Sequence, residues 1–238
     1  MDIFVSAAVK RERRPSLEYI PRHRHQSPYL ALVLSGGYEE AGDYGRRRVG
    51  PGDIVFHGRF TAHLDRFSRA GAEILNLALP ENFEPTFPFA RVTDADEAAR
   101  LAERDPAEAV ALLLETARPA RIPPLDWSDE LASRLTHDPA VALRGWAREH
   151  GLTEATVSRH FRQIYGIAPK LFRAEARGRM AWKAILRGGR PLADLAFALG
   201  FADQAHMSRA VRAITGRPPS GWRTAGSTGF KTEAVAAG

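Results

Sequence analysis

SRHFRQIYGIAP (residues 158–169) and SRAVRAITGRPP (residues 208–219) are two similar copies of one segment. They lie fifty positions apart and agree at six of twelve positions, so chance is a poor explanation. An apolar stretch precedes each copy, at residues 143–150 and 192–199, and ends in a glycine, Gly151 or Gly200. Because glycine adopts the positive φ that ends a helix sharply, the next helix can cross the first. The repeat therefore predicts two helix-turn-helix units.

The second helix of each unit is expected to bury an apolar side and expose a polar one. Thr153 is a good N-cap residue, and apolar side chains follow at helical spacing in both units. These inward residues are Val157, Phe161 and Ile164, and Met207, Val211 and Ile214. Small residues and arginines on the other side could approach base edges and phosphates of DNA, and a glutamine suits a bidentate pair with adenine. The candidate DNA-binding residues are Thr153, Ala155, Ser158, Arg159, Arg162, Gln204, Ala205, Ser208, Arg209 and Arg212.

A long helix is predicted between the two units. It would begin at Pro169, run to about Arg187 and end at Gly188 and Gly189. Such a helix rises roughly 28 Å at about 1.5 Å per residue. That length suits two recognition helices held about one turn of DNA, ~34 Å, apart, so that both enter successive major grooves.

The positive charge of the chain is concentrated in the region of the repeat. Residues 140–223 hold fifteen Lys or Arg and five Asp or Glu, a balance of +10, whereas the whole chain has +6. Such an asymmetry is typical of a surface that binds a polyanion, although a solvated basic surface gives the same count.

The rest of the chain reads as a β region followed by helices. Between residues 17 and 80, short apolar runs alternate with turn clusters, among them residues 35–37, 42–45 and 50–53, which predicts a small antiparallel sandwich or barrel. Helices are expected over residues 94–104 and from Asp105 to about Ala117, where Asp105 and Pro106 form a typical helix start. We therefore predict an α+β chain with a sensor or dimerisation domain (1–90), a helical linker (91–126), a helical DNA-binding domain (127–225) and a disordered tail (226–238).

Composition narrows the chemistry. The chain has no cysteine, which excludes disulfides, thiolate zinc sites and a cysteine nucleophile. No basic leader or long apolar run is present, so a cytoplasmic location is expected. No nucleophile setting or glycine-rich phosphate loop is recognisable, and we predict no catalytic residue, cofactor or metal.

Residues 140–223 resemble the AraC/XylS-type DNA-binding domain. The resemblance is most specific in PLADLAFALGF (191–201), DQAHMSR (203–209) and GRPPSGWR (216–223). It implies a transcription regulator, an activator among the expected roles, in which two recognition helices contact DNA. Base-reading roles are implied at Ala155, Ser158, Arg159, Gln204, Ala205 and Arg209. Ala202 stands where the family usually has a capping serine, which would cost about 1 kcal/mol unless Asp203 compensates.

The N-terminal region resembles, less specifically, the cupin-like sensor domain that often accompanies this module. The resemblance is carried by His23 and His25, by the PGD turn at residues 51–53, and by His63. In metal-binding cupins a His-x-His pair, a carboxylate and a later histidine converge, but here the glutamate expected shortly after the pair is missing. We therefore expect His23, His25, His57 and His63 to line a small-molecule effector pocket or to satisfy strand hydrogen bonds. The three arginines of residues 46–48 could contact an anionic effector or form a solvated edge strand.

Two functions from different classes follow. The first is a regulator that binds double-stranded DNA as a monomer or homodimer, with room for a small-molecule effector and for contact with RNA polymerase. The second is a metal-dependent cupin enzyme with an accessory nucleic-acid-binding module, against which the missing carboxylate argues. Neither the operator nor the effector can be identified from the sequence.

Overall fold

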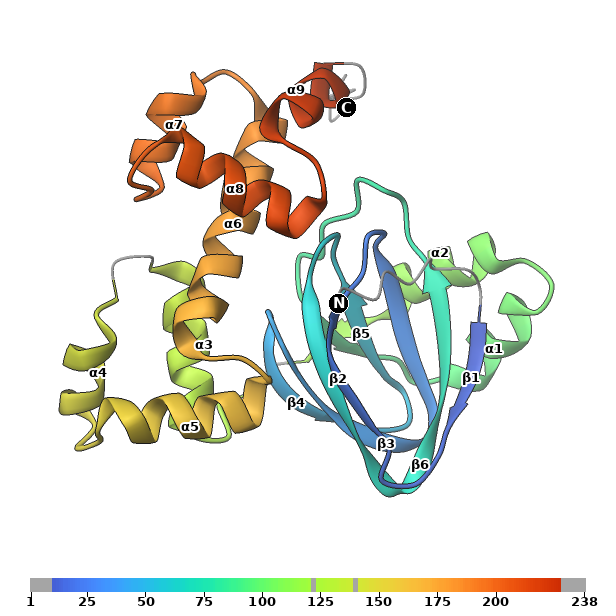
Figure 1. Ribbon diagram of the computed structural model, residues 1–238. Helices are drawn as coiled ribbons and strands as arrows, with labels where there is room; N and C mark the ends of the chain where they lie inside the picture. Colours follow the sequence, from blue (N-terminus) through green and yellow to red (C-terminus); the bar gives the residue numbers. More distant parts are fainter. Residues whose placement is uncertain (1–9, 121–122, 139–140, 228–238) are drawn as a thin grey trace. The chain divides into compact units, whose positions relative to one another are not determined.

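A computed structural model describes residues 10–120, 123–138 and 141–227 of the chain (Figure 1). Contacts divide it into two compact units. One holds the β-sheet and the helices through Pro169, apart from the end of α3; the other holds the end of α3 and residues from Lys170 onward. The predicted disordered tail overlaps the end of the last helix at residues 226–227, and its remaining residues lie outside the described ranges. Within those ranges no helix is long and apolar enough to cross a membrane.

The described N-terminal residues form one antiparallel sheet, as the alternating apolar runs predict. Its strands are β1 (Lys10–Arg14), β2 (Tyr19–Arg24), β3 (Tyr29–Gly42), β4 (Gly45–Val49), β5 (Asp53–His57), β6 (Ala62–Ala78), β7 (Phe89–Arg91) and β8 (Arg118–Pro119). The hydrogen-bonded order is β1-β6-β3-β5-β7-β8, with β2 added to β6 and β4 added to β3. The long pair β3 and β6 is thus the centre of the sheet.

One predicted turn is a bulge instead. Residues 35–37 lie inside β3, where the pairing with β6 shifts register on both sides of Gly36. Gly36 has φ +69°, and a Cβ there would lie 2.2 Å from the carbonyl oxygen of Gly71. The backbones of the two strands approach too closely for any other side chain, so the glycine bends the strand without ending it. The turns at residues 42–45 and 50–53 are where the sequence predicts them.

The sheet is buried on both faces. Leu30 and Leu32 of β3 pack with Ala98 and Leu113 from α1 (Ala95–Ala102) and α2 (Pro106–Thr116), which cover one face. The intervening residues Tyr29, Ala31 and Val33 face the other way, into a second core. Because successive side chains of a strand point to opposite faces, this explains why residues 29–33 are all apolar and buried.

Capping side chains begin the helices where the sequence predicts them. The Asp105 carboxylate accepts hydrogen bonds from the backbone N–H groups of Ala107 and Glu108, at 3.0 Å each. The remaining helices are α3 (Trp127–His137), α4 (Leu143–Glu149), α5 (Glu154–Tyr165), α6 (Pro169–Arg187), α7 (Leu192–Ala198), α8 (Gln204–Thr215) and α9 (Pro219–Ser227). Gly151 and Gly200 have φ of +65° and +70°, as the turn of each helix-turn-helix unit requires.

The cap of α8 differs from the expectation. The carboxylate of Asp203 itself accepts from the backbone N–H of His206 at 2.6 Å, so Asp203 is the N-cap. The helix begins one residue later than the family pattern suggests, and Ala202 lies outside it. Asp203 therefore compensates for Ala202, and it does so as the cap itself, because aspartate caps as well as serine.

Gly178 lets α6 and α8 cross closely. A Cβ at this position would lie 2.7 Å from Ile214 Cδ1 and 3.2 Å from the carbonyl oxygen of Ala210. Both partners belong to α8, and the carbonyl cannot move without distorting that helix. The sequence pattern alone does not reveal this contact.

We predict that Gly178→Leu lowers the free energy of unfolding by about 1–3 kcal/mol, because the added side chain overpacks the contact with α8. Urea unfolding followed by circular dichroism measures the change. Gly221→Leu in α9 is the matched control, because a Cβ at Gly221 meets no atom within 4 Å. Equal effects of the two substitutions would contradict the role of Gly178.

Candidate nucleic-acid interface and sheet cavity

Helix α5 presents the polar side that the sequence predicts. The hydroxyl of Thr153 caps it by accepting from the Thr156 backbone N–H at 3.1 Å. Val157 and Phe161 are buried, but Tyr165 rather than Ile164 completes the buried side. The buried residues of α5 are thus four positions apart, which places the ring of Tyr165 in the core. On the opposite side Glu154, Ala155, Arg159 and Arg162 are exposed and Ser158 is half-buried.

Helix α8 repeats this arrangement. Met207, Val211 and Ile214 are buried as predicted. Exposed residues on the other side are Gln204, Ala205, Arg209 and Arg212, with Ser208 half-buried. The Ser208 hydroxyl donates to the carbonyl oxygen of Gln204 at 2.8 Å. Its hydrogen is thus used within the helix, which leaves the Gln204 amide and the arginines as the donors available to a ligand.

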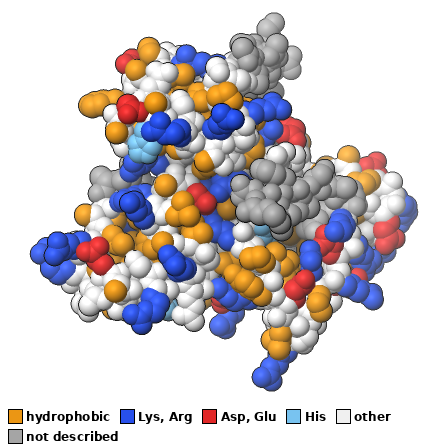
Figure 2. All heavy atoms as spheres, viewed as in Figure 1, with side chains coloured by type: hydrophobic (Ala, Val, Ile, Leu, Met, Phe, Trp, Pro, Cys, Tyr) orange, Lys and Arg blue, Asp and Glu red, His pale blue; other side chains and the backbone are white. Residues whose placement is uncertain are grey.

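The arginines of these two faces are free for an external partner. In the part of the chain that the structure describes, the guanidinium groups of Arg159, Arg162, Arg209 and Arg212 form no ion pair or hydrogen bond. Figure 2 shows Lys and Arg side chains over the region of α5 and over that of α8. Unpaired guanidinium groups at corresponding positions of a repeat are suited to bind phosphates and guanine edges.

The two repeats are anchored at the same position by different contacts. Tyr165 and Thr215 occupy equivalent places at the ends of α5 and α8. Tyr165 donates its hydroxyl hydrogen to the carboxylate of Asp129 in α3 at 2.8 Å. The Thr215 oxygen accepts from the indole N–H of Trp222 at 2.9 Å. Trp222, like Trp146 and Trp182, is buried.

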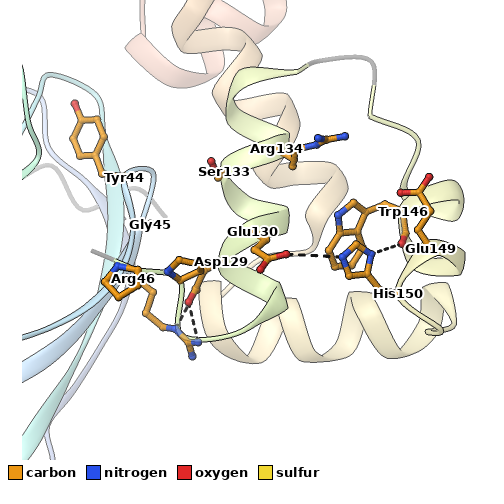
Figure 3. A pocket seen from close by; sticks show the side chains of 12 residues that line it. Tyr44, Gly45, Arg46, Asp129, Glu130, Ser133, Arg134, Trp146, Glu149 and His150 are labelled. Carbon is orange, nitrogen blue, oxygen red and sulfur yellow. Dashed lines mark hydrogen bonds and ion pairs between the residues drawn. The ribbon is translucent and has the colours of Figure 1, made fainter. Parts of the chain in front are cut away.

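Arg46 connects the sheet to the start of α3. Its guanidinium lies 2.7 Å from an Asp126 oxygen and 3.1 Å from an oxygen of Asp129, and its side chain is 7% exposed. Figure 3 shows Arg46, from β4, directed at Asp129 at the start of α3. The three arginines of residues 46–48 therefore differ: Arg46 is buried, whereas Arg48 is exposed. Arg46 therefore neither contacts an anionic effector nor lies on a solvated strand edge, the two roles expected from the sequence, because it is buried and paired with carboxylates.

A second arginine reaches α5 from the sheet. Arg66 of β6 donates to the backbone carbonyls of Gln163 and of Ile164, the latter at 3.1 Å. These carbonyls belong to the last turn of α5, where they have no partner within the helix and carry its partial negative charge. Arg66 follows Asp65, a residue of the sheet cavity, directly in sequence.

The four predicted histidines converge on one cavity. The cavity has a volume of about 420 Å³ and is lined by His23, His25, His57 and His63. His25 Nε2 and His63 Nε2 lie 3.1 Å apart, and Tyr29, which the sequence reading missed, places its hydroxyl oxygen 3.2 Å and 3.3 Å from these two atoms.

Two carboxylates also join the cluster, although no glutamate follows the His-x-His pair closely in the sequence. Glu40 Oε2 lies 3.5 Å from His57 Nε2 and 3.4 Å from His63 Nδ1, and Asp65 Oδ1 lies 3.2 Å from His63 Nδ1. Glu40 is far along β3 from the His-x-His pair, and the pairing with β6 places it opposite Asp65. A search for a glutamate shortly after the pair cannot find it, because the strand register rather than sequence distance brings it there.

Burial sets the protonation of this cluster. Burial, followed by the charge of His63, lowers the pKa of His23 to about 4 and lowers that of His57 well below its usual value. Burial alone would also lower the pKa of His63, but Asp65 and Glu40 outweigh it and raise that pKa to about 10. Without another cation, His63 is therefore the charged partner of the two carboxylates.

Comparison with known proteins places a family domain on the repeat. Residues 146–225 match a family model described as a helix-turn-helix domain. Among solved structures, the chain is similar to an AraC-type transcriptional regulator from Chromobacterium violaceum, with 19% identity over 42% of this chain and 92% of that chain (TM-score 0.39).

Two further solved structures are similar to the chain. They are the C-terminal domain of AraT, a response regulator from Geobacillus stearothermophilus (19% identity, 50% of this chain and 97% of that chain, TM-score 0.40), and unsaturated fatty acid-bound ToxT from Vibrio cholerae (10% identity, 91% and 94%, TM-score 0.37). No curated protein sequence matches the chain.

Residues 146–225 thus form a helix-turn-helix domain that contains both copies of the sequence repeat. Its two exposed helix faces are suited to bind DNA. The chain as a whole has an antiparallel sheet followed by this helical region.

Arg46 and Arg48 should respond differently to the same substitution. We predict that Arg46→Met lowers the free energy of unfolding by about 3 kcal/mol, because it leaves the buried Asp129 carboxylate without its cation. Arg48→Met, two positions along the same strand, should change it by less than about 0.5 kcal/mol. Urea unfolding measures both, and a large effect at Arg48 or none at Arg46 would refute the assignment.

Proposed function

We propose that α5 and α8 are recognition helices that enter successive major grooves of one operator. The observation that carries this proposal is the pair of exposed polar faces, each with two arginines that have no partner among the described residues. Identical residue types at positions fifty apart indicate that both faces do the same work. The activity proposed is sequence-specific binding without catalysis.

The two ends of each face have different tasks in this proposal. Ala155, Ser158 and Arg159 read base edges in one groove, and Gln204, Ala205 and Arg209 read them in the other. Arg162 and Arg212 lie one turn further along their helices, and we assign them to phosphates, which position the protein without reading sequence. Thr153 and Ser208 support their helices through hydrogen bonds to the backbone.

The connecting helix supports the proposed spacing. Helix α6 has 19 residues, as the sequence predicts, and therefore rises about 28 Å. Its end at Gly188 and Gly189, with φ of +70° and +85°, allows the chain to turn directly into the second unit. A rigid spacer of this length is commensurate with the ~34 Å between successive major grooves.

The sheet is proposed to sense a small molecule and to transmit its presence to α5. Strand β6 carries His63 and Asp65 at the cavity and Arg66 at the last turn of α5. A ligand that shifts β6 would therefore move the guanidinium that binds α5. We propose residues 127–225 as the DNA-binding module and the preceding part as the sensor, which could also form the dimer contact.

Substitutions in α8 should separate base reading from phosphate binding. Arg209→Ala is expected to weaken specific operator binding by about 1–3 kcal/mol and to leave non-specific binding nearly unchanged. Arg212→Ala should weaken binding to every sequence alike and reduce the slope of affinity against salt by about one. Electrophoretic shifts with fragments selected from the host genome measure both.

Arg69→Ala is the control for charge, because Arg69 is an exposed arginine of β6. It should leave operator binding unchanged. In footprints, Arg159→Ala and Arg209→Ala should each relax specificity at a different half-site, with centres about 10 base pairs apart. Unchanged affinity in Arg209→Ala, or loss of the same half-site in both variants, would count against two recognition helices.

A further inference from the structure

Two buried polar atoms beside the sheet cavity have no hydrogen bond within the described residues. These are Glu40 Oε2 and His57 Nε2, on side chains that are 3% and 2% exposed. They face each other at 3.5 Å, a distance at which two hydrogen-bonding atoms are not in good contact. Buried polar atoms of this kind are rare in folded proteins, and each costs free energy unless another group satisfies it.

The distances between these atoms fit ligands of one metal ion. Glu40 Oε2 lies 3.5 Å from His57 Nε2 and 3.4 Å from His63 Nδ1, and each of the three residues has one possible ligand atom within 4.8 Å of those of the other two. Ligands at about 2.0–2.2 Å from a common ion are separated by roughly 3.0–3.5 Å. Only small adjustments would be needed to bring the three atoms around one ion.

Charge also favours a cation at this place. Glu40 and Asp65 are both buried, and in the described chain their ion pairs are made with histidines and with no Lys or Arg. One protonated imidazole, that of His63, balances only one of these two carboxylates, whereas a divalent ion in place of its proton would balance both. Asp65 Oδ1 lies 3.2 Å from the same nitrogen, His63 Nδ1, so Asp65 would place a second negative charge beside the ion.

We propose that Glu40, His57 and His63 bind one divalent transition-metal ion. Two imidazoles and one carboxylate suit Zn²⁺, Fe²⁺, Co²⁺ or Ni²⁺, whereas Ca²⁺ and Mg²⁺ prefer oxygen ligands alone. Three protein ligands leave coordination positions open toward the 420 Å³ cavity, where a small molecule could complete the shell. Only the effect of the bound metal on DNA binding depends on the proposed sensor role. The proposal replaces the expectation that the chain binds no metal.

A second set of histidines shares the cavity and provides the sharpest control. His23, His25 and His63 also lie within 4.8 Å of one another, but His25 and His63 already contact each other and the Tyr29 hydroxyl through Nε2. The proposed site uses the other nitrogen of His63, Nδ1. Removing His57 and removing His23 therefore distinguish the two sets.

The test is calorimetric titration of the full-length, chelator-treated protein with Zn²⁺ and with Co²⁺, each alone. One ion should bind per chain, and bound Co²⁺ should show visible absorption bands of a site with nitrogen and oxygen ligands. His57→Gln should lower the affinity about 100-fold or more, whereas His23→Gln should lower it by less than about 10-fold, the lower end for a residue outside the ligand shell. Ca²⁺ and Mg²⁺ should produce no heat of binding.

Several results would overturn the inference. They are an absence of Zn²⁺ and Co²⁺ binding, unchanged affinity in His57→Gln, or a greater loss in His23→Gln than in His57→Gln. Circular dichroism of each variant before titration checks that the fold is intact, and if His57→Gln is unfolded, Glu40→Gln takes its place with the same expected loss. DNA binding is measured separately with and without Zn²⁺, so a failed titration leaves the assignment of α5 and α8 untouched.

Discussion

The antiparallel pairing of β3 with β6 is the constraint on which the sheet and its cavity depend. Every other strand joins the sheet directly or indirectly through these two. Their register places Glu40 opposite Asp65 and Gly42 opposite His63. A side chain at position 42 would collide with His63, because a Cβ there would lie 2.7 Å from the Cβ of His63. A slip of one residue would turn all these groups to the other face and dissolve the cluster.

The helical part was largely predictable because its determinants are local. A helix begins at a capping side chain such as Asp105 or Thr153 and ends at a glycine with positive φ, and both signals lie within a few residues of the boundary they set. The sequence repeat shows the same helix signals twice, so each copy supports the prediction made from the other. Compensation for Ala202 is local too, because the next residue, Asp203, caps α8.

The remaining features depend on residues distant in sequence. Arg46 and Arg48 look alike in the sequence, yet only Arg46 contacts Asp126 and Asp129, some eighty positions away. Glu40 joins the histidines through a strand register that two bulges in β3 determine. Gly178 is required by the nearness of Ala210 in another helix. No periodicity or spacing in the sequence indicates these long-range contacts, because they form only when the chain is folded.

The unlike anchors at the ends of α5 and α8 give the two copies of one segment separate dependencies. Tyr165 is fixed to a carboxylate that also neutralises an arginine of the sheet, so the seat of α5 shares its charge balance with the N-terminal half. Thr215 is fixed to a neutral indole within its own unit. In the proposed function, the position of α5 therefore depends on contacts with the sheet. The position of α8 depends on a contact within its own unit. A graded response to a signal then needs only one of the two to change.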